Sequence, residues 1–252
     1  MDLSGRTLLA IFAHPDDESI ACGGVLARCA AAGARVVVMC ATHGENRAGR
    51  RDADLFETRA QELRRAAHEL GVSEVVLLDY PDGFLPWVDR AEFEACIASE
   101  LRRLNPDVVI TFGDDGLYWH PDHIAVHERT TAAVASFGDA APALYYVTMP
   151  PGQMRKLVDE WRMDPERSGS SAPILGVIDV DAFGIEANPP TLVIDVSTAA
   201  DRKLAALKCH QTQVAHGALD RLRDDAAARL LGVEHFHRST IASTRDAFIE
   251  RL

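Results

Sequence analysis

The sequence predicts an α/β protein with a Rossmann-like, doubly wound, mostly parallel sheet of strand order 3-2-1-4-5, followed by an additional C-terminal strand and helices. Short unbroken apolar runs recur along the chain, helical apolar patterns alternate with them through about the first 150 residues, and glycines stand where those helices should end. Unbroken apolar runs indicate strands that are covered on both faces. Their alternation with helices favours a parallel sheet.

Six segments are predicted to be strands because they are short, apolar and rich in β-branched residues. They are TLLAIFA (7–13), RVVVMCA (35–41), EVVLLD (74–79), DVVITF (107–112), ALYYVTM (143–149) and TLVIDV (191–196). We expect the first five to form the parallel sheet and the sixth to be the additional strand.

Helices are predicted after the first three strands, where apolar residues recur every three or four positions. The stripes are Cys22-Val25-Leu26-Cys29, Phe56-Ala60-Leu63-Ala67-Leu70 and Phe93-Ile97-Leu101-Leu104. Gly33 and Gly71 follow the first two stripes and are expected to end those helices, since glycine adopts the left-handed conformation of a helix C-terminus.

The chain is expected to form one domain over 1–252. Residues 162–190 interrupt the alternation and are rich in Pro, Gly, Ser and Asp. A long segment of this composition is typical of a loop, and we interpret it as a lid or insertion at the rim of a binding site.

Composition excludes several classes of partner. The net charge of −12 disfavours nucleic acid and anionic membranes. There is no apolar run long enough to span a bilayer, and the N-terminus does not resemble a signal peptide. Five cysteines without a CxxC pair are expected to be buried thiols in a reducing cytoplasm. A homo-oligomer is left open.

Two polar clusters of similar composition follow the first and fourth strands. The first is HPDDES at 14–19, and the second is FGDDGLYWHPDH at 112–123. In a 3-2-1-4-5 sheet the strand order reverses between these two strands, and ligands bind at that point beyond the carboxyl ends. The topology therefore predicts that both clusters meet in one crevice.

A divalent cation would turn the repulsion among these acids into attraction. His14, Asp17 and one histidine of HPDH would supply the three protein ligands of a catalytic zinc site, which leaves Asp16 free to act as a general base. The alternative is structural: Asp16 or Asp17 could cap the following helix. Pro15 keeps His14 out of the helical region, and neighbouring residues of an extended HPDD turn should point to opposite sides.

With AHPDDE at 13–18 and HPDH at 120–123, the chain resembles the LmbE-like or PIG-L-like family of zinc-dependent deacetylases, and its sugar-thiol branch of deacetylases and amidases most closely. Weaker matches extend along the chain and include Gly44-Glu45, Arg59–Leu63, Asp82-Gly83, Asp195–Ser197, Lys203 and His210–Gln213. The resemblance implies that His14, Asp17 and His123 bind the metal and that Asp16 is the base.

It further implies that His120 stabilises the tetrahedral intermediate or protonates the leaving amine, that Asp122 orients His120, and that Tyr118 polarises the substrate carbonyl. Arg59 and Asp82 would hold sugar hydroxyls. The expected metal is Zn²⁺, with Fe²⁺ or another divalent ion as the alternative.

The function expected from this resemblance is removal of an N-acyl, usually acetyl, group from an N-acetylglucosamine-type aminosugar by metal-activated water. Its partner is then a small acylated aminosugar. The alternatives are an amidase acting on a larger sugar-thiol conjugate and a non-catalytic sugar-binding protein. A metal-free dinucleotide-binding module would need G-x-G-x-x-G after the first strand, where this chain has HPDDES.

Overall fold

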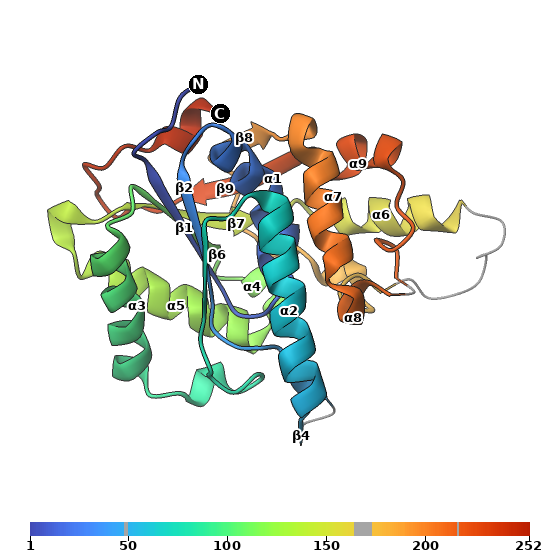
Figure 1. Ribbon diagram of the computed structural model, residues 1–252, viewed down its shortest axis with the longest axis horizontal. Coiled ribbons are helices and arrows are strands. Elements are labelled where there is room, and N and C mark those ends of the chain that lie inside the picture. The colour runs from blue at the N-terminus through green and yellow to red at the C-terminus, as the bar shows by residue number, and fades with distance from the viewer. Residues whose placement is uncertain (48–49, 164–172, 216) are drawn as a thin grey trace.

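A seven-stranded mixed sheet organises the protein (Figure 1). The computed structural model describes residues 1–252 except 48–49, 164–172 and 216. The strand order is β5-β2-β1-β6-β7-β9-β8, in which the first five strands are parallel and the last two pair antiparallel. The predicted order 3-2-1-4-5 is confirmed by these five parallel strands.

The strands of the sheet are short, and all of them except β9 fall within or close to the predicted segments. They are β1 (Thr7–Phe12), β2 (Arg35–Cys40), β5 (Glu74–Leu77), β6 (Val108–Phe112), β7 (Ala143–Thr148), β8 (Leu192–Asp195) and β9 (Val233–Arg238). A separate two-stranded hairpin is formed by β3 (Asn46–Arg47) and β4 (Arg50–Arg51).

Helices cover both faces of the sheet. Figure 1 shows α3 and α5 on one side and α1, α2 and α7 on the other. The α-helices are α1 (Asp17–Ala31), α2 (Ala53–Leu70), α3 (Arg90–Leu104), α4 (Gly116–Trp119), α5 (Pro121–Ala135), α6 (Gln153–Arg162), α7 (Ala200–Cys209), α8 (Gln211–Val214) and α9 (Asp224–Leu231). The 3₁₀ turns are η1 (Leu85–Trp87), η2 (Gly138–Ala140), η4 (Val180–Ala182), η5 (Ser197–Ala199) and η6 (Phe248–Arg251).

The predicted helix signals lie where the pattern placed them. The four residues of the first stripe are fully buried in α1. Gly71 has φ 76° and ends α2, with its N–H bonded to the carbonyls of Ala67 and His68. Gly33, with φ 93°, follows the end of α1. In the part of the chain that the structure describes, no helix is both long and apolar enough to cross a bilayer.

The C-terminal part of the sheet has one strand more than predicted. The predicted sixth strand is present as β8, and it pairs antiparallel with β9, which was not predicted. β9 lies between β7 and β8 and runs antiparallel to both. Its sequence, VEHFHR, carries charged or imidazole side chains at four of its six positions, so it lacks the apolar run that marked the other strands.

The predicted lid at 162–190 is only partly described. Residues 164–172 lie outside the described residues. The remainder carries a single antiparallel bridge between Ile174 and Val177 and the short turn η4.

A buried ion pair fixes the helix that begins with the HPDDE motif. α1 is broken at Cys22, whose φ of −147° is not helical. The backbone N–H groups of Gly24 and Val25 donate to the two carboxylate oxygens of Glu234, each at 2.8 Å. Lys203 Nζ lies 2.6 Å from the same carboxylate, and both side chains are almost completely buried. Glu234 thus caps the second half of α1.

Replacing Glu234 by alanine is expected to lower the free energy of unfolding by roughly 3–5 kcal/mol, because a buried ammonium group is left without its partner. Urea denaturation measures this loss. Glu94→Ala, which removes an exposed ion pair with Arg90, is the matched control and should cost only about 0.3–0.5 kcal/mol. Equal losses in the two variants would contradict the role assigned to Glu234.

Candidate metal centre and active-site pocket

The two polar clusters lie against each other in the fold. β1 ends at Phe12 and β6 ends at Phe112, and the two strands are parallel neighbours. Because the carboxyl ends of parallel strands reach the same edge of a sheet, the segments that follow them meet there. His14 Nδ1, from the first segment, lies 3.1 Å from His123 Nε2, from the second.

Three donor groups, two imidazoles and one carboxylate, surround one point in this crevice. The Asp17 carboxylate places Oδ2 3.4 Å from His14 Nδ1 and Oδ1 3.3 Å from His123 Nε2. Tetrahedral zinc, with bonds of about 2.0–2.1 Å to nitrogen and oxygen, holds its ligand atoms roughly 3.3 Å apart. The observed separations therefore fit a small divalent cation, and imidazole with carboxylate is a donor set suited to zinc.

The other nitrogen of each imidazole is already engaged, and this fixes which atom faces the centre. His123 Nδ1 donates to the carbonyl of Gly116 at 3.0 Å, which leaves a lone pair on Nε2. His14 Nε2 lies 3.0 Å from Asp82 Oδ1 and 3.3 Å from Asp122 Oδ2. It therefore carries the proton, and Nδ1 faces the centre. Carboxylates behind a ligating histidine orient the ring and raise its basicity.

Two sets of described residues have the composition of a metal site with ligand atoms within 4.8 Å of one another: His14 with His120 and His123, and His14 with Asp82 and Asp122. In the second set, both carboxylates are within hydrogen-bond distance of His14 Nε2, so they orient the imidazole ring. His14 and His123 of the first set, together with the Asp17 carboxylate, form the candidate metal centre, and His120 lies beside it.

Charges around the centre favour a cation at this point. Burial lowers the pKa of His123 to about 3 and keeps this imidazole neutral. Burial opposes ionisation of Asp17, yet the imidazoles of His123 and His14 outweigh it and hold the pKa of Asp17 below its usual range. Burial also opposes protonation of His14, but Asp122, Asp17 and Asp82 raise its pKa well above the ordinary value. The same carboxylates would stabilise a metal ion.

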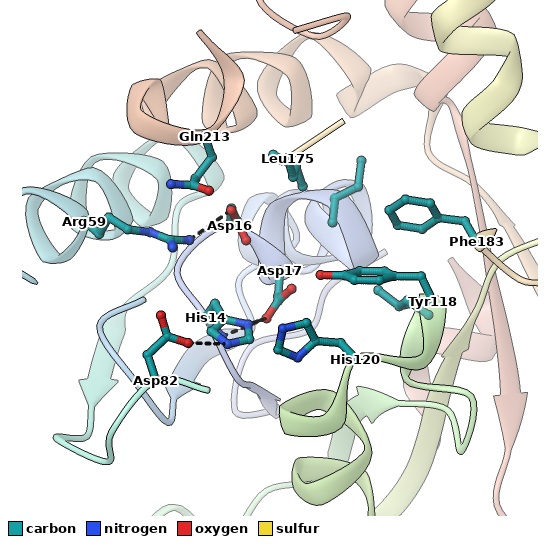
Figure 2. A pocket seen from close by; sticks show the side chains of 12 residues that line it. His14, Asp16, Asp17, Arg59, Asp82, Tyr118, His120, Leu175, Phe183 and Gln213 are labelled. Carbon is teal, nitrogen blue, oxygen red and sulfur yellow. Dashed lines mark hydrogen bonds and ion pairs between the residues drawn. The ribbon is translucent and has the colours of Figure 1, made fainter. Parts of the chain in front are cut away.

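Asp16 is directed away from the helix that follows it. It occupies the N-cap position of α1 but makes no side-chain capping bond, so the structural alternative for Asp16 is wrong. Its carboxylate accepts a hydrogen bond from Arg59 Nη2 at 3.1 Å, and Figure 2 shows it beside Asp17 in the pocket. Burial raises the pKa of Asp16 to about 7, with Arg59 acting in the opposite direction and Asp17 adding to the rise. A carboxylate with such a pKa is suited to take a proton near neutral pH.

The sequence predicts an extended backbone at Asp16, and this prediction is wrong. Its φ is 122° and its ψ is −26°, a conformation that costs a non-glycine residue roughly 1–3 kcal/mol. The N–H of Asp16 donates to Glu18 Oε2 at 3.0 Å. Glu18 Oε1 in turn lies 2.9 Å from His210 Nε2. The buried pair of Glu18 and His210 thus supports the unusual backbone conformation of Asp16.

Asp122 contacts a different histidine from the one expected. Its carboxylate is 3.3 Å from His14 Nε2. It also accepts hydrogen bonds from the backbone N–H groups of Gly83 at 2.7 Å and Leu85 at 3.0 Å. Its backbone N–H donates to His120 Nδ1 at 3.2 Å. The Asp122 side chain therefore orients His14, while its backbone fixes the ring of His120. Because Nδ1 accepts this bond, His120 carries its proton on Nε2. Burial and the neighbouring His14 lower the pKa of His120.

Tyr118 enters the pocket from a distorted turn. Leu117 and Trp119 on either side of it have positive φ values of 65° and 64°. The turn leaves Trp119 half exposed while Tyr118 lies inward, its ring centroid 5.2 Å from that of His123. Burial raises the pKa of Tyr118 well above its usual range, and Asp17 and Asp16 add to the rise. The phenol therefore remains a hydrogen-bond donor.

These side chains line one pocket of about 140 Å³ (Figure 2), formed by His14, Asp16, Asp17, Ile20, Arg59, Asp82, Leu117, Tyr118, His120, Leu175, Phe183 and Gln213. Arg59 is held by the carbonyls of Gly44 and Pro15 at 2.9 and 2.6 Å, and Asp82 accepts the N–H of Asn46 at 2.8 Å. Both residues predicted to hold sugar hydroxyls thus reach the pocket.

Several pocket residues were not among the predicted site residues. Ile20, Leu117, Leu175 and Phe183 are apolar, and Leu175 and Phe183 lie in the 162–190 segment that we interpreted as a lid or insertion at the rim of a binding site. Gln213 lies in the HQTQ stretch that had marked the family resemblance, so that resemblance was the one signal for it.

Comparisons with known proteins identify the family of this chain. Residues 9–134 match the family described as PIG-L: GlcNAc-PI de-N-acetylase. The chain is 33% identical, over 93% of its length and 93% of the relative, to 1D-myo-inositol 2-acetamido-2-deoxy-alpha-D-glucopyranoside deacetylase of Thermobifida fusca.

Solved structures share the fold at lower identity. N,N'-diacetylchitobiose deacetylase of Pyrococcus horikoshii has a TM-score of 0.62 and 21% identity, covering 93% of this chain and 84% of that one. The 4-carboxy-2-hydroxymuconate hydratase of Pseudomonas putida KT2440 has a TM-score of 0.63 and 19% identity, covering 96% and 99%. Since the family model spans half of this chain and the relative matches nearly all of it, the chain belongs to the PIG-L, or GlcNAc-PI de-N-acetylase, family.

Proposed function

We propose that this protein removes the N-acetyl group from an N-acetylglucosamine-type aminosugar with the help of a divalent metal ion. The observation that carries the proposal is the set of donors on His14, Asp17 and His123, 3.1–3.4 Å apart, next to the Asp16 carboxyl with a pKa of about 7. The relative from Thermobifida fusca, named as a deacetylase of a glucosaminide of myo-inositol, supports this substrate class.

His14 Nδ1, His123 Nε2 and the Asp17 carboxylate would hold the ion. We propose Zn²⁺, and Fe²⁺ is the alternative with the same donor preference. When bound, such an ion supplies Lewis acidity and lowers the pKa of water. Asp82 and Asp122 keep His14 in the tautomer that can bind it.

The chain's own residues complete the hydrolysis. Asp16 takes a proton from the attacking water, whose oxygen forms a bond to the acyl carbon. Tyr118 O–H and His120 Nε2–H donate hydrogen bonds to the oxygen on which negative charge develops. The C–N bond then breaks, the amine nitrogen receives the proton, and acetate leaves. Arg59 and Asp82 are proposed to hold the sugar, as the family resemblance implied.

The fold alone does not select this reaction, because the Pseudomonas putida hydratase shares it. An amidase acting on a larger sugar conjugate uses the same chemistry and remains the second candidate. A non-catalytic sugar-binding protein is disfavoured by the complete set of metal donors and the adjacent base.

Release of free amine from N-acetylglucosaminides, including one linked to inositol, tests the proposal. We expect activity in the protein as isolated, near-complete loss after dialysis against a chelator, and recovery on adding Zn²⁺ or Fe²⁺. Elemental analysis before and after dialysis identifies the ion. Unchanged amine release from protein shown to be metal-free would refute the metal role, and no release from any acylated aminosugar would refute the function.

We also propose that the protein works in the cytoplasm, because its five cysteines are all free thiols. Burial raises the pKa of the Cys29 thiol to about 12, so this thiol is protected from deprotonation.

A further inference from the structure

The pocket has two chemically different ends. Figure 2 shows Arg59 and Asp82 on one side of His14 and the rings of Tyr118 and Phe183 on the other. The first end offers a guanidinium group and a carboxylate. The lining of the pocket also includes four apolar side chains, Ile20, Leu117, Leu175 and Phe183, of which Figure 2 shows Leu175 and Phe183 on the side away from Asp82. The candidate metal centre lies between the two ends.

The apolar end is built by a segment that is fastened to the Tyr118 turn. The Phe183 ring lies 4.8 Å from the Tyr118 ring, and the N–H of Gly184 donates to the carbonyl of Leu117 at 2.9 Å. Gly184 has φ 72°, and a Cβ there would lie 1.8 Å from the carbonyl oxygen of Met149. Only glycine permits this approach, so the segment is held against the catalytic turn by its backbone.

An amide substrate has two substituents of correspondingly different character. In an N-acyl aminosugar the nitrogen carries a ring with several hydroxyls, whereas the carbonyl carbon carries an alkyl group. Hydroxyls need hydrogen-bonding partners when they leave water. An alkyl group gains free energy on burial against apolar side chains. With the amide at the metal centre, the sugar therefore matches the end with Arg59 and Asp82.

We propose that Ile20, Leu117, Leu175 and Phe183 form the subsite for the acyl group, and that Leu175 determines how long an acyl chain the enzyme accepts. This inference rests on the proposed function. Leu175 is partly buried and comes from the segment after α6, whereas Ile20 and Leu117 belong to the helices that carry the reacting groups. Leu175 can therefore be shortened without touching a catalytic side chain.

The test compares N-acetyl, N-propionyl and N-butyryl glucosamine derivatives with one and the same sugar. We expect the natural protein to prefer acetyl, the acyl group in the named substrate of the Thermobifida fusca relative. Leu175→Ala should raise the ratio of kcat/KM for butyryl over acetyl by about 10-fold or more, the discrimination that a single methylene gives in an apolar pocket. Ile178→Ala is the matched control, since Ile178 lies in the same segment but is 79% exposed.

Leu175→Phe provides the opposite change. Narrowing the subsite should reduce turnover of butyryl more than that of acetyl, so this variant decides the matter even if Leu175→Ala folds poorly. An acyl ratio that stays unchanged in both variants, or that shifts equally in Ile178→Ala, would overturn the acyl subsite. Absence of amine release from every substrate in the natural protein would instead refute the proposed function.

Discussion

Asp17→Ala is expected to lose bound metal and catalytic activity together. The substitution removes one of three donors and the negative charge that stabilises a cation between His14 Nδ1 and His123 Nε2. It also removes the acceptor of the His14 backbone N–H, which donates to Asp17 Oδ2 at 2.8 Å. Because even residues behind the ligands typically contribute 10- to 100-fold to metal affinity, removing a ligand should weaken binding by roughly 100-fold or more.

Elemental analysis after dialysis measures metal content, and amine release from the same sample measures activity. Asp54→Ala is a suitable control, because Asp54 occupies the first turn of α2 as Asp17 occupies that of α1, yet it is exposed. We expect this variant to match the unaltered protein in both measurements. A protein that kept both its metal and its rate without Asp17 would show that the ion is held elsewhere.

Asp16→Asn is expected to retain the metal and lose rate. Asparagine keeps the shape of the side chain and an oxygen that can accept from Arg59 Nη2. It also tolerates positive φ better than most residues, so the backbone at 122° should persist. It cannot take a proton from water, and a positioned general base contributes about 10²- to 10⁴-fold to rate.

Metal content near that of the unaltered protein, combined with a fall in kcat of this size, would agree with the assigned role. The comparison with Asp17→Ala is the informative part of the experiment, since the two aspartates are adjacent in sequence. A rate within a few-fold of normal, or a loss of metal as large as that in Asp17→Ala, would rule out Asp16 as the base.

The parallel part of the sheet could be predicted because its signals are local. The strands β1, β2, β5, β6 and β7 are continuous apolar runs, and the stripes between them have helical spacing. General rules of topology then placed the ends of β1 and β6 side by side. The meeting of His14 with His123, which are 109 residues apart, follows from those rules.

The orientation of the site residues depends on contacts that no local pattern contains. Glu18 fixes the Asp16 backbone from two residues away but is itself bonded to His210, 192 residues further along the chain. Glu234, which is 210 residues away from Gly24 in the sequence, accepts a hydrogen bond from the Gly24 N–H just after the break in α1. The carboxylate of Asp122 bonds to His14 and not to its sequence neighbour His120.

The sequence by itself therefore determined the parallel sheet, the crevice and the kinds of donor that meet there, because periodicity and composition are properties of short segments. Only the tertiary structure decided the antiparallel position of β9, the tautomers of His14 and His123, and the apolar wall with Leu175. Each of these depends on which distant group satisfies a buried hydrogen bond or fills a particular volume. That choice is made by packing of the whole chain.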